Sequence, residues 1–115
     1  DIPRVRLGTL LKETLVEMSR KGLGMSAVID RDGRVAGVYT DGDLRRTLDR
    51  SVDIHSTLVE DVMTRGGITV GPNILAAEAL RVMEDRKING LLVIDEEERL
   101  VGALNMHDLL RAGVV

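Results

Sequence analysis

The chain of 115 residues contains an internal repeat, and this feature limits its possible folds more than any other. Residues 10–46 align with residues 75–111 at a constant offset of 65 without a gap, and twelve of the 37 aligned positions are identical. In the first copy these identical positions are Leu10, Glu13, Leu15, Met18, Val28, Ile29, Asp30, Arg34, Gly37, Asp43, Leu44 and Arg46. Because the identities are spread along the whole unit, we infer a duplicated supersecondary element. Two copies are too few for a solenoid, so we expect a pseudo-twofold pair that shares one core.

Each copy has the hydrophobic periodicity of a helix, two short strands and a closing helix. The elements expected in the first copy are a helix at 10–21, strands at 25–29 and 35–39, and a helix at 41–48. Those expected in the second copy are a helix at 74–86, strands at 91–94 and 100–104, and a helix at 106–112. The connector between the copies is expected to form a short helix at 58–63 and a strand at 68–70. This order predicts a mixed α/β (α+β) fold.

Several single residues make this expectation more specific. Thr9 is the expected N-cap of the first helix, and Gly22 is its expected stop. Gly37 and Gly102 interrupt the second strand of each copy at the same place, which predicts a bulge or a close backbone approach. The residues expected to face inward from the two opening helices are Leu11, Leu15, Met18, Leu75, Ala79, Val82 and Met83.

The composition excludes several classes of function. Hydrophobic residues make up 43% and charged residues 30% of the chain, as is usual for a folded globular domain. Tyr39 is the only aromatic residue and the net charge is −3, so neither a base-stacking surface nor general attraction to nucleic acid or anionic membranes is expected. The chain has no cysteine, which excludes thiolate metal sites and fits a reducing compartment. No apolar run exceeds four residues and no secretory leader is recognisable, so no membrane segment is expected.

Two turns between a strand and its closing helix carry the polar residues of greatest interest. Thr40 and Asn105 are good N-cap residues, and Asp43 and Asp108 follow three positions later, as in a capping box. The same turn presents free backbone N–H groups that suit a phosphate, and its carboxylate could accept hydrogen bonds from ribose hydroxyls. A structural cap and a ligand site are therefore both open, and they are compatible with each other.

The chain resembles a pair of CBS domains. The resemblance rests on the repeat and on the sequences Gly-Val-Tyr-Thr-Asp-Gly-Asp-Leu (37–44), Gly-Ala-Leu-Asn-Met-His-Asp-Leu (102–109) and Asp-Val-Met-Thr (61–64). Segments 20–25, 40–46 and 105–115 are most similar to the C-terminal half of D-arabinose-5-phosphate isomerases. The resemblance implies a first CBS unit at 1–52, with its N-terminal part truncated, and a second at 53–115. In such enzymes the active site lies in a preceding sugar-isomerase domain, so the resemblance implies no catalytic residue and no required cofactor in this chain.

The resemblance also implies where a ligand would bind, because CBS pairs hold nucleotides in the clefts between the two units. For the first site it implies Thr40, Asp41, Gly42 and Asp43, with Arg45 and Arg46 nearby and with Gly24, Met25, Ser26 and Ala27 shaping the base pocket. For the second site it implies Asn89, Gly90, Leu91, Asn105, His107 and Asp108. Asn105 stands where Thr or Ser is usual, which indicates that the ligand is not simply AMP.

The function implied by the resemblance is regulatory sensing of a nucleotide or nucleotide sugar by a cytoplasmic, homodimeric protein. One candidate ligand is CMP-Kdo, because arabinose 5-phosphate supplies the route to Kdo in lipopolysaccharide. The alternative is an oligomerisation module with no ligand of its own. Catalysis within the chain is disfavoured because no nucleophile–base or carboxylate pair emerges. The chain has only two histidines, His55 and His107, and no metal site is expected.

Overall fold

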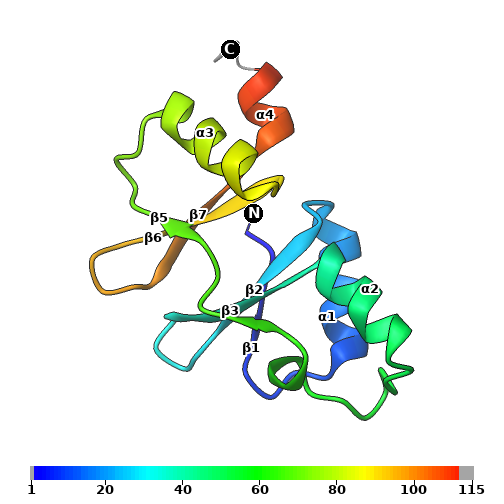
Figure 1. Cartoon of the computed structure of the whole chain (residues 1–115). Coiled ribbons are helices and arrows are strands. Elements are labelled where there is room, and N and C mark those ends of the chain that lie inside the picture. Colours follow the sequence, from blue (N-terminus) through cyan, green and yellow to red (C-terminus); the bar gives the residue numbers. More distant parts are fainter. Residues whose placement is uncertain (1, 112–115) are drawn as a thin grey trace. The chain divides into compact units, whose positions relative to one another are not determined.

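The computed structural model describes residues 2–111 of the chain. The chain divides into two compact units, Asp1–Gly67 and Ile68–Val115 (Figure 1). Each unit combines a small sheet with helices in the predicted helix–strand–strand–helix order, and this confirms the mixed α/β fold class. Within residues 2–111, no helix has the length and apolar composition needed to cross a bilayer.

The first unit is a four-stranded sheet covered on one face by two helices. Its elements are β1 (Arg4–Arg6), α1 (Leu11–Lys21), β2 (Met25–Ile29), β3 (Val35–Thr40), α2 (Asp41–Asp49), a 3-10 helix η1 (Val59–Asp61) and β4 (Thr64–Arg65). The strand order is β1-β2-β3-β4, in which β1 runs parallel to β2 and the other neighbours are antiparallel. Leu11 and Met18 of α1 meet Val28 and Tyr39 of the sheet in a buried core, which Val59 completes.

The second unit has a three-stranded sheet and repeats the helix positions of the first. Its elements are β5 (Thr69–Val70), α3 (Ala76–Arg86), β6 (Gly90–Ile94), β7 (Leu100–Asn105) and α4 (Met106–Arg111). The order is β5-β6-β7, with β5 parallel to β6 and β6 antiparallel to β7. Ala79 and Met83 of α3 pack on Leu91 of β6 to form the core, against which Leu104 and Leu109 also pack. The residue Ala112, at the end of the predicted closing helix, lies outside the described residues.

The first turn of α1 differs from the prediction. The N-cap is Leu10 rather than Thr9, and it makes no side-chain capping hydrogen bond. The helix instead donates its first N–H groups to the connector: Leu11 N–H donates to the carbonyl of Thr57 at 2.8 Å, and Lys12 N–H donates to that of Ile54 at 3.1 Å. A distant segment therefore satisfies donors that a local side chain was expected to satisfy. The predicted stop is confirmed, because Gly22 is the C-cap with a φ of 67°.

The second opening helix also begins later than predicted. Leu75 was expected to face inward, but it is the N-cap, with an extended ψ of 144°, and it is 66% exposed. Because the backbone of Leu75 is extended rather than helical, the spacing of a helix does not determine which way its side chain points. The other inward positions of this helix are confirmed, since Ala79 and Met83 are buried and Val82 packs against them.

Gly37 is placed where β3 bulges and where another strand comes close. The register between β2 and β3 shifts at this point, with Val28 paired to Gly37 and Ile29 paired to Val35. A Cβ at Gly37 would lie 2.6 Å from the carbonyl oxygen of Thr64, so only glycine allows β4 to pair here. The corresponding shift occurs at Gly102 in the second unit, where a Cβ would meet Val93 at 3.4 Å. The predicted bulge is therefore present in both copies.

The connector packs against the first unit. The predicted helix at 58–63 is reduced to the short 3-10 helix η1, and the next residues form β4, a strand the sequence did not predict. Val59 is fully buried in the first core, and Val38 pairs with Thr64. The division of the chain after residue 52, which the family resemblance implies, remains a prediction, whereas the boundary between the compact units follows Gly67.

Candidate functional site

The turn between β3 and α2 is closed by a complete capping box. Thr40 Oγ1 accepts a hydrogen bond from the backbone N–H of Asp43 at 3.2 Å, and the Asp43 carboxylate accepts from the backbone N–H of Thr40 at 3.0 Å. The carboxylate at the helix N-terminus also interacts favourably with the helix dipole. The capping interpretation of Thr40 and Asp43 is therefore correct for the first unit.

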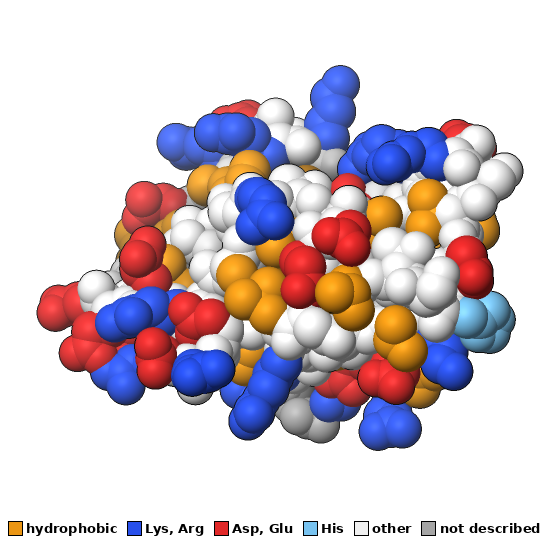
Figure 2. All heavy atoms as spheres, turned by 90° about the horizontal axis from the view of Figure 1, so that it is seen from below, with side chains coloured by type: hydrophobic (Ala, Val, Ile, Leu, Met, Phe, Trp, Pro, Cys, Tyr) orange, Lys and Arg blue, Asp and Glu red, His pale blue; other side chains and the backbone are white. Residues whose placement is uncertain are grey.

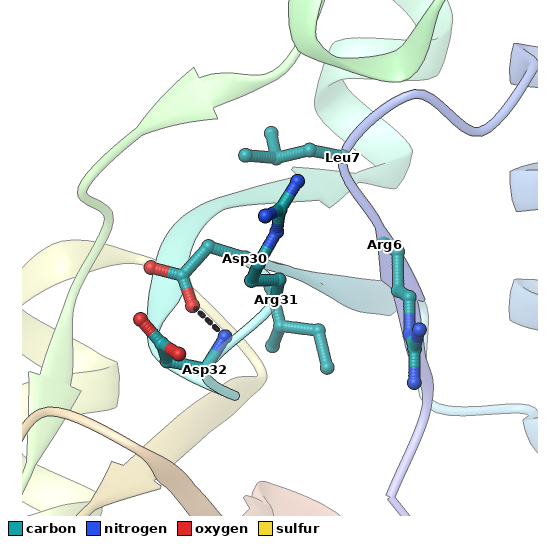
Figure 3. Close-up of a pocket in the computed structure, with 6 residues that line it drawn as sticks. Arg6, Leu7, Asp30, Arg31 and Asp32 are labelled. Carbon is teal, nitrogen blue, oxygen red and sulfur yellow. Dashed lines mark hydrogen bonds between the residues drawn. The ribbon is translucent and has the colours of Figure 1, made fainter.

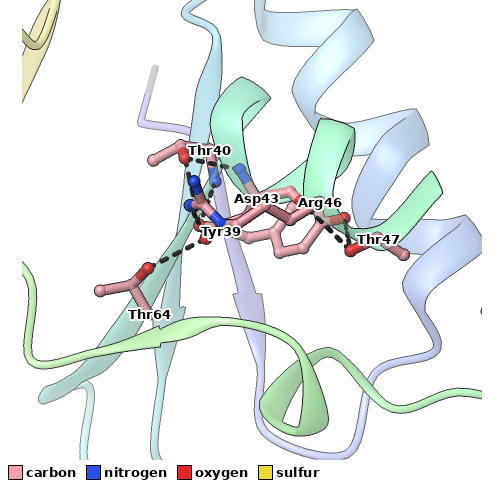
Figure 4. A network of polar contacts seen from close by, with 6 residues as sticks. All are labelled: Tyr39, Thr40, Asp43, Arg46, Thr47 and Thr64. Carbon is pink, nitrogen blue, oxygen red and sulfur yellow. Dashed lines mark hydrogen bonds and ion pairs between the residues drawn. The ribbon is translucent and has the colours of Figure 1, made fainter. Parts of the chain in front are cut away.

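The Asp43 carboxylate makes contacts well beyond this cap (Figure 4). Oδ2 accepts from the backbone N–H and, at 3.1 Å, from the hydroxyl of Thr40. Oδ1 accepts from Arg46 Nη2 at 2.6 Å and from Thr64 Oγ1 at 3.0 Å. Asp43 is only 4% exposed, so a nearly buried carboxylate joins the ends of β3 and α2 to β4.

A second polar chain supports α2 from the core side. Thr47 Oγ1 donates to the backbone carbonyl of Asp43 at 2.8 Å and shares a hydrogen bond of 2.9 Å with the hydroxyl of Tyr39. Tyr39 is fully buried, and this burial raises its pKa above the ordinary value of 10.0. The hydrogen bond with Thr47 lowers the pKa of Tyr39, whereas the negative charge of Asp43 adds to the increase. The single aromatic side chain is thus held at both its ring and its hydroxyl.

The structure brings the loop before β2 next to this turn. The backbone N–H of Asp41 donates to the carbonyl of Gly24 at 3.1 Å, and Met25 pairs with Thr40 across the two strands. Gly24 has a φ of +76°, and a Cβ there would lie 3.1 Å from Asp41 Oδ2. The backbone of the two predicted halves of the first site is therefore contiguous within the first unit.

The predicted side chains of β2 do not all point the same way. Ser26 pairs with Tyr39 and shares the helix-covered face of the sheet, whereas Met25 and Ala27 alternate onto the other face. All three residues are buried, and Ser26 Oγ donates to the carbonyl of Ala27. The side chain of Ser26 therefore faces the helices, and the side chains of Met25 and Ala27 face away from them.

On α2, the predicted residues other than Asp43 are more accessible. Asp41, Arg45 and Arg46 are exposed, and the side chain of Arg46 is 67% exposed even though it contacts Asp43. Gly42 lies beneath this guanidinium, since a Cβ on Gly42 would be 3.6 Å from both Arg46 Nη2 and Thr40 Oγ1. The first turn of α2 is thus covered by a side chain whose charge faces solvent.

The second unit repeats this backbone arrangement. The N–H of Met106 donates to the carbonyl of Asn89 at 2.8 Å, as Asp41 does to Gly24, and Gly90 pairs with Asn105. Asn105 Oδ1 accepts from the N–H of His107 at 2.7 Å and more weakly from that of Asp108 at 3.4 Å.

The second turn differs from the first in the exposure of its aspartate, whereas Leu91 points to the helix-covered face as its counterpart Ser26 does. Asp108 accepts from Arg111 at 3.0 Å, but its side chain is 64% exposed, in contrast to the nearly buried Asp43. Leu91 points into the core against Ala79 and Met83, so its side chain packs the core rather than lining the turn. His107 is exposed.

One important member of the first cluster, Thr64, was not among the site residues predicted from the sequence. Thr64 comes from the connector, 21 positions from Asp43, and reaches it only because β4 pairs with β3. Its one signal in the sequence is its place in Asp-Val-Met-Thr, which was assigned to the start of the second unit.

A cavity of about 400 Å³ lies elsewhere in the first unit, at the far ends of β1 and β2 (Figure 3). Arg6, Leu7 and Arg31 line it, and Figure 3 shows the Arg6 and Arg31 side chains pointing in different directions. Asp30 beside it accepts from the backbone N–H groups of Asp32 and Arg34, which fixes the hairpin turn. The charges lining this cavity do not converge on a common point.

The distribution of charged side chains reveals neither a patch of one charge on the face shown in Figure 2 nor a metal site among the described residues. On the face shown in Figure 2, basic and acidic side chains are interspersed rather than gathered into separate patches. Among residues 2–111, no group of three or more His, Cys, Asp or Glu side chains is arranged to hold a metal ion. Polar clusters recur in both units at the strand-to-helix turns and at the hairpin turns, where Asp30 and Asp95 each accept from two backbone N–H groups of their own turn.

Comparison with protein families and curated proteins gives consistent similarities. The CBS domain model matches residues 1–50 and 59–115. Arabinose 5-phosphate isomerase KdsD of Pseudomonas aeruginosa is 59% identical over 114 residues, which are 99% of this chain and 35% of that protein. The KdsD of Escherichia coli K12 is 49% identical over 115 residues, all of this chain and again 35% of the relative. The chain thus spans about a third of the length of these relatives.

Solved structures share the fold at lower sequence identity. A protein with CBS domains from Burkholderia ambifaria has a TM-score of 0.86 and 26% identity, and the match covers 99% of this chain and 83% of the other. A CBS domain protein from Pyrobaculum aerophilum, complexed with AMP, has a TM-score of 0.84, 20% identity and coverage of 99% and 92%. The CBS domain pair of protein MJ0100, in complex with 5′-methylthioadenosine and S-adenosyl-L-methionine, has a TM-score of 0.85, 20% identity and coverage of 99% and 89%.

Proposed function

The chain belongs to the CBS-domain family, and from this premise we propose that it is a regulatory module that senses a nucleotide-type ligand. We further propose that it serves a D-arabinose-5-phosphate isomerase in the cytoplasm, with catalysis in a separate sugar-isomerase domain of the same protein. The high identity to the KdsD proteins, of which the chain covers 35%, supports this assignment. The chain itself then has a binding role and no catalytic one.

The observation that carries the proposal is the recurrence of one backbone arrangement. In each unit the first residue of the closing helix donates to the loop before the hairpin, Asp41 to Gly24 and Met106 to Asn89. This bond holds a helix N-terminus beside a strand start, where backbone N–H groups suit a phosphate and loop groups can meet a base. The AMP and S-adenosyl-L-methionine in structurally similar CBS proteins support a nucleotide-type ligand.

A thermal-shift series tests this function on the 115-residue chain. AMP, ATP, CMP and CMP-Kdo are added separately, and sodium phosphate at equal ionic strength serves as the control. A ligand present at 100 times its dissociation constant is expected to raise the unfolding free energy by about 2.7 kcal/mol. If none of the four compounds shifts the melting temperature beyond the phosphate control at millimolar concentration, the sensor function is wrong.

We propose CMP-Kdo as the specific ligand, acting as a feedback signal from a later step of the route to Kdo. Thr40 and Asp43 are assigned to the ribose or phosphate, with Arg45, Arg46 and His107 as partners for the acidic sugar. Asn105, in place of a hydroxyl residue, supports a ligand other than AMP alone. Calorimetry with CMP-Kdo, CMP and AMP distinguishes these ligands: tight binding of AMP without binding of CMP-Kdo would reject the feedback role but keep the sensor.

An oligomerisation module is the second candidate, and exposed apolar side chains favour it. Val16 on α1 is 56% exposed and Leu48 on α2 is 61% exposed. Both helices cover one face of the first sheet, but these two side chains are exposed to solvent. Pairing of such residues in a homodimer would remove them from water. Light scattering is expected to give twice the monomer mass at high micromolar concentration and a lower mass for Leu48→Glu. A mass that stays monomeric for the unmodified chain contradicts the homodimer.

A further inference from the structure

The Asp43 carboxylate has no room for an additional hydrogen bond in the described structure. A carboxylate offers about four acceptor positions on its two oxygens. Thr40 fills two of them through its N–H and hydroxyl, and Arg46 and Thr64 fill the other two. A ligand hydroxyl can therefore bind Asp43 only by displacing one of these donors.

Of the donors to the Asp43 carboxylate, Arg46 can be displaced with the smallest loss of other contacts. The N–H of Thr40 belongs to the helix cap, and the Thr40 hydroxyl also accepts from the N–H of Asp43. Thr64 is held in β4 by its pairing with Val38. The Arg46 side chain is 67% exposed, and Asp43 is its only hydrogen-bond or ion-pair partner among residues 2–111. Only the arginine side of this ion pair is exposed, so water can hydrate a released guanidinium, whereas the nearly buried carboxylate needs a ligand hydroxyl in its place.

A released Arg46 remains close to the helix N-terminus. Its guanidinium already lies over Gly42 and near the hydroxyl of Thr40, as the 3.6 Å distances to a Cβ on Gly42 show. Figure 4 shows the same guanidinium beside Thr40 and Asp43. A phosphate bound to the N–H groups of this turn would therefore lie within reach of the arginine, which binds phosphate well because its planar donors can pair with two oxygens.

We propose that Arg46 is a specificity-determining residue that makes the first site select phosphorylated nucleotides over nucleosides. Without a ligand it occupies Asp43, and with a nucleotide it transfers from the carboxylate to the phosphate while a ribose hydroxyl takes its place. A nucleoside must displace Arg46 without offering it a new partner and so binds poorly. This inference rests on the proposed function, because it concerns the same site.

The second unit supplies an internal comparison. Arg111 contacts Asp108 at the same spacing of three residues, but the Asp108 side chain is 64% exposed. Among the described residues, Arg111 is the only side chain that donates to its carboxylate, so acceptor positions stay open to a hydroxyl. Arg111 therefore has no comparable control over its turn.

The test is calorimetry of the 115-residue chain with two ligand pairs, AMP with adenosine and CMP with cytidine. In Arg46→Ala, the dissociation constant of the monophosphate is expected to rise about tenfold and that of the nucleoside to fall about two- to fivefold. Arg46→Gln keeps an amide donor for Asp43 but loses the charge. It is expected to weaken monophosphate binding while leaving nucleoside binding as weak as in the unmodified chain.

Two matched variants serve as controls. Arg50→Ala removes the same charge from the C-terminal end of α2, away from the turn, and Arg111→Ala removes the equivalent ion pair of the second unit. Both are expected to keep the monophosphate-to-nucleoside preference of the first site within about twofold. If Arg46→Ala changes both ligands of a pair by the same factor, or if Arg50→Ala has the same effect as Arg46→Ala, the inference is wrong. If the unmodified chain binds neither monophosphate but does bind ATP or CMP-Kdo, the inference is wrong and the sensor function stands. If it binds none of AMP, CMP, ATP and CMP-Kdo, the proposed function itself fails.

Discussion

The two aspartates at the corresponding turns show how much the surroundings of one residue type can differ. Asp43 accepts four hydrogen bonds and is 4% exposed, whereas the side chain of Asp108 is 64% exposed. Sequence spacing predicted both carboxylates as helix caps. It could not predict that Thr64, which lies 21 positions away, donates a hydrogen bond to Asp43. Burial of a residue depends on neighbours that a local pattern does not contain.

Asp43→Asn is expected to destabilise the chain by about 1.5–3 kcal/mol, the usual contribution of hydrogen bonds to a charged group. The amide keeps one acceptor but places an N–H₂ group opposite donors such as Arg46 or Thr64. Asp108→Asn is the matched control and is expected to change the unfolding free energy only slightly, because its carboxylate faces solvent. Urea denaturation measures both values. Equal effects at the two positions would contradict the structural role of Asp43.

The buried Tyr39 is expected to make the chain less stable at alkaline pH. Burial raises the pKa of Tyr39 in the folded chain above its ordinary value of 10.0, so folding favours the protonated phenol. The contribution of Tyr39 to the unfolding free energy is therefore fully present below pH 10.0, the ordinary pKa. It decreases as the pH rises from there through the higher pKa of the folded chain. In Tyr39→Phe this decrease is expected to disappear, at a cost near neutral pH of about 1 kcal/mol for the lost bond to Thr47.

Urea melts of the unmodified chain and Tyr39→Phe between pH 8 and 11 check this expectation. Thr47→Val is a useful companion, because it removes the same hydrogen bond but leaves the phenol to titrate. The decrease with pH should therefore persist in Thr47→Val. The same decrease in Tyr39→Phe would assign it to another group.

At the scale of elements, the sequence was most informative where a structure depends on local periodicity. The predicted strand at 25–29 is β2, with both ends as expected, and the helices at 10–21 and 41–48 differ from α1 and α2 by one residue. Elements that depend on distant partners were missed or misplaced. β4 exists because β3 offers it an edge, and the start of α1 is fixed by carbonyls of the connector.

The glycines of the two bulges test this dependence on a distant strand. A Cβ at Gly37 would lie 2.6 Å from the Thr64 carbonyl and 2.8 Å from Met63 Sδ, so Gly37→Ala must push β4 away. We expect a loss of about 1–3 kcal/mol, the usual cost of overpacking, measured by thermal or urea unfolding. At Gly102 the nearest atom is 3.4 Å away, and Gly102→Ala is expected to cost clearly less. The reverse order would show that β4 does not constrain β3.

At the scale of the whole molecule, the sequence repeat and the compact units divide the chain at different places. The repeat identified a first copy at 10–46 and the family resemblance implied a first unit at 1–52, whereas the first compact unit extends to Gly67. The additional residues include the buried Val59 and the strand β4, which complete the first core and its sheet. Identity between copies reveals what was duplicated, but a connector that has no second copy gives no such signal.

This difference predicts how shortened chains behave. A chain of residues 1–67 retains Val59, β4 and the connector carbonyls that accept from Leu11 and Lys12. A chain of residues 1–52 loses all of them, which leaves the N–H groups of Leu11 and Lys12 without their acceptors and the Asp43 carboxylate without the hydroxyl of Thr64. Small domains have little stability to spare, so we expect cooperative urea unfolding, followed by circular dichroism, for 1–67 but not for 1–52.

The decisive comparison is between these shortened chains and a point variant of the longer one. Val59→Ala in 1–67 leaves a cavity where a fully buried side chain stood and is expected to cost more than about 1 kcal/mol. Thr57→Ala keeps the backbone carbonyl that accepts from Leu11 and should change stability much less. Cooperative unfolding of 1–52 with a midpoint equal to that of 1–67 would show that the connector is not part of the first unit. The unfolding free energy is expected to decrease from 1–67 to its Val59→Ala variant and again to 1–52. This order would place the boundary of the first folded unit after β4, because stability then follows the buried contacts of the connector rather than the limits of the repeat.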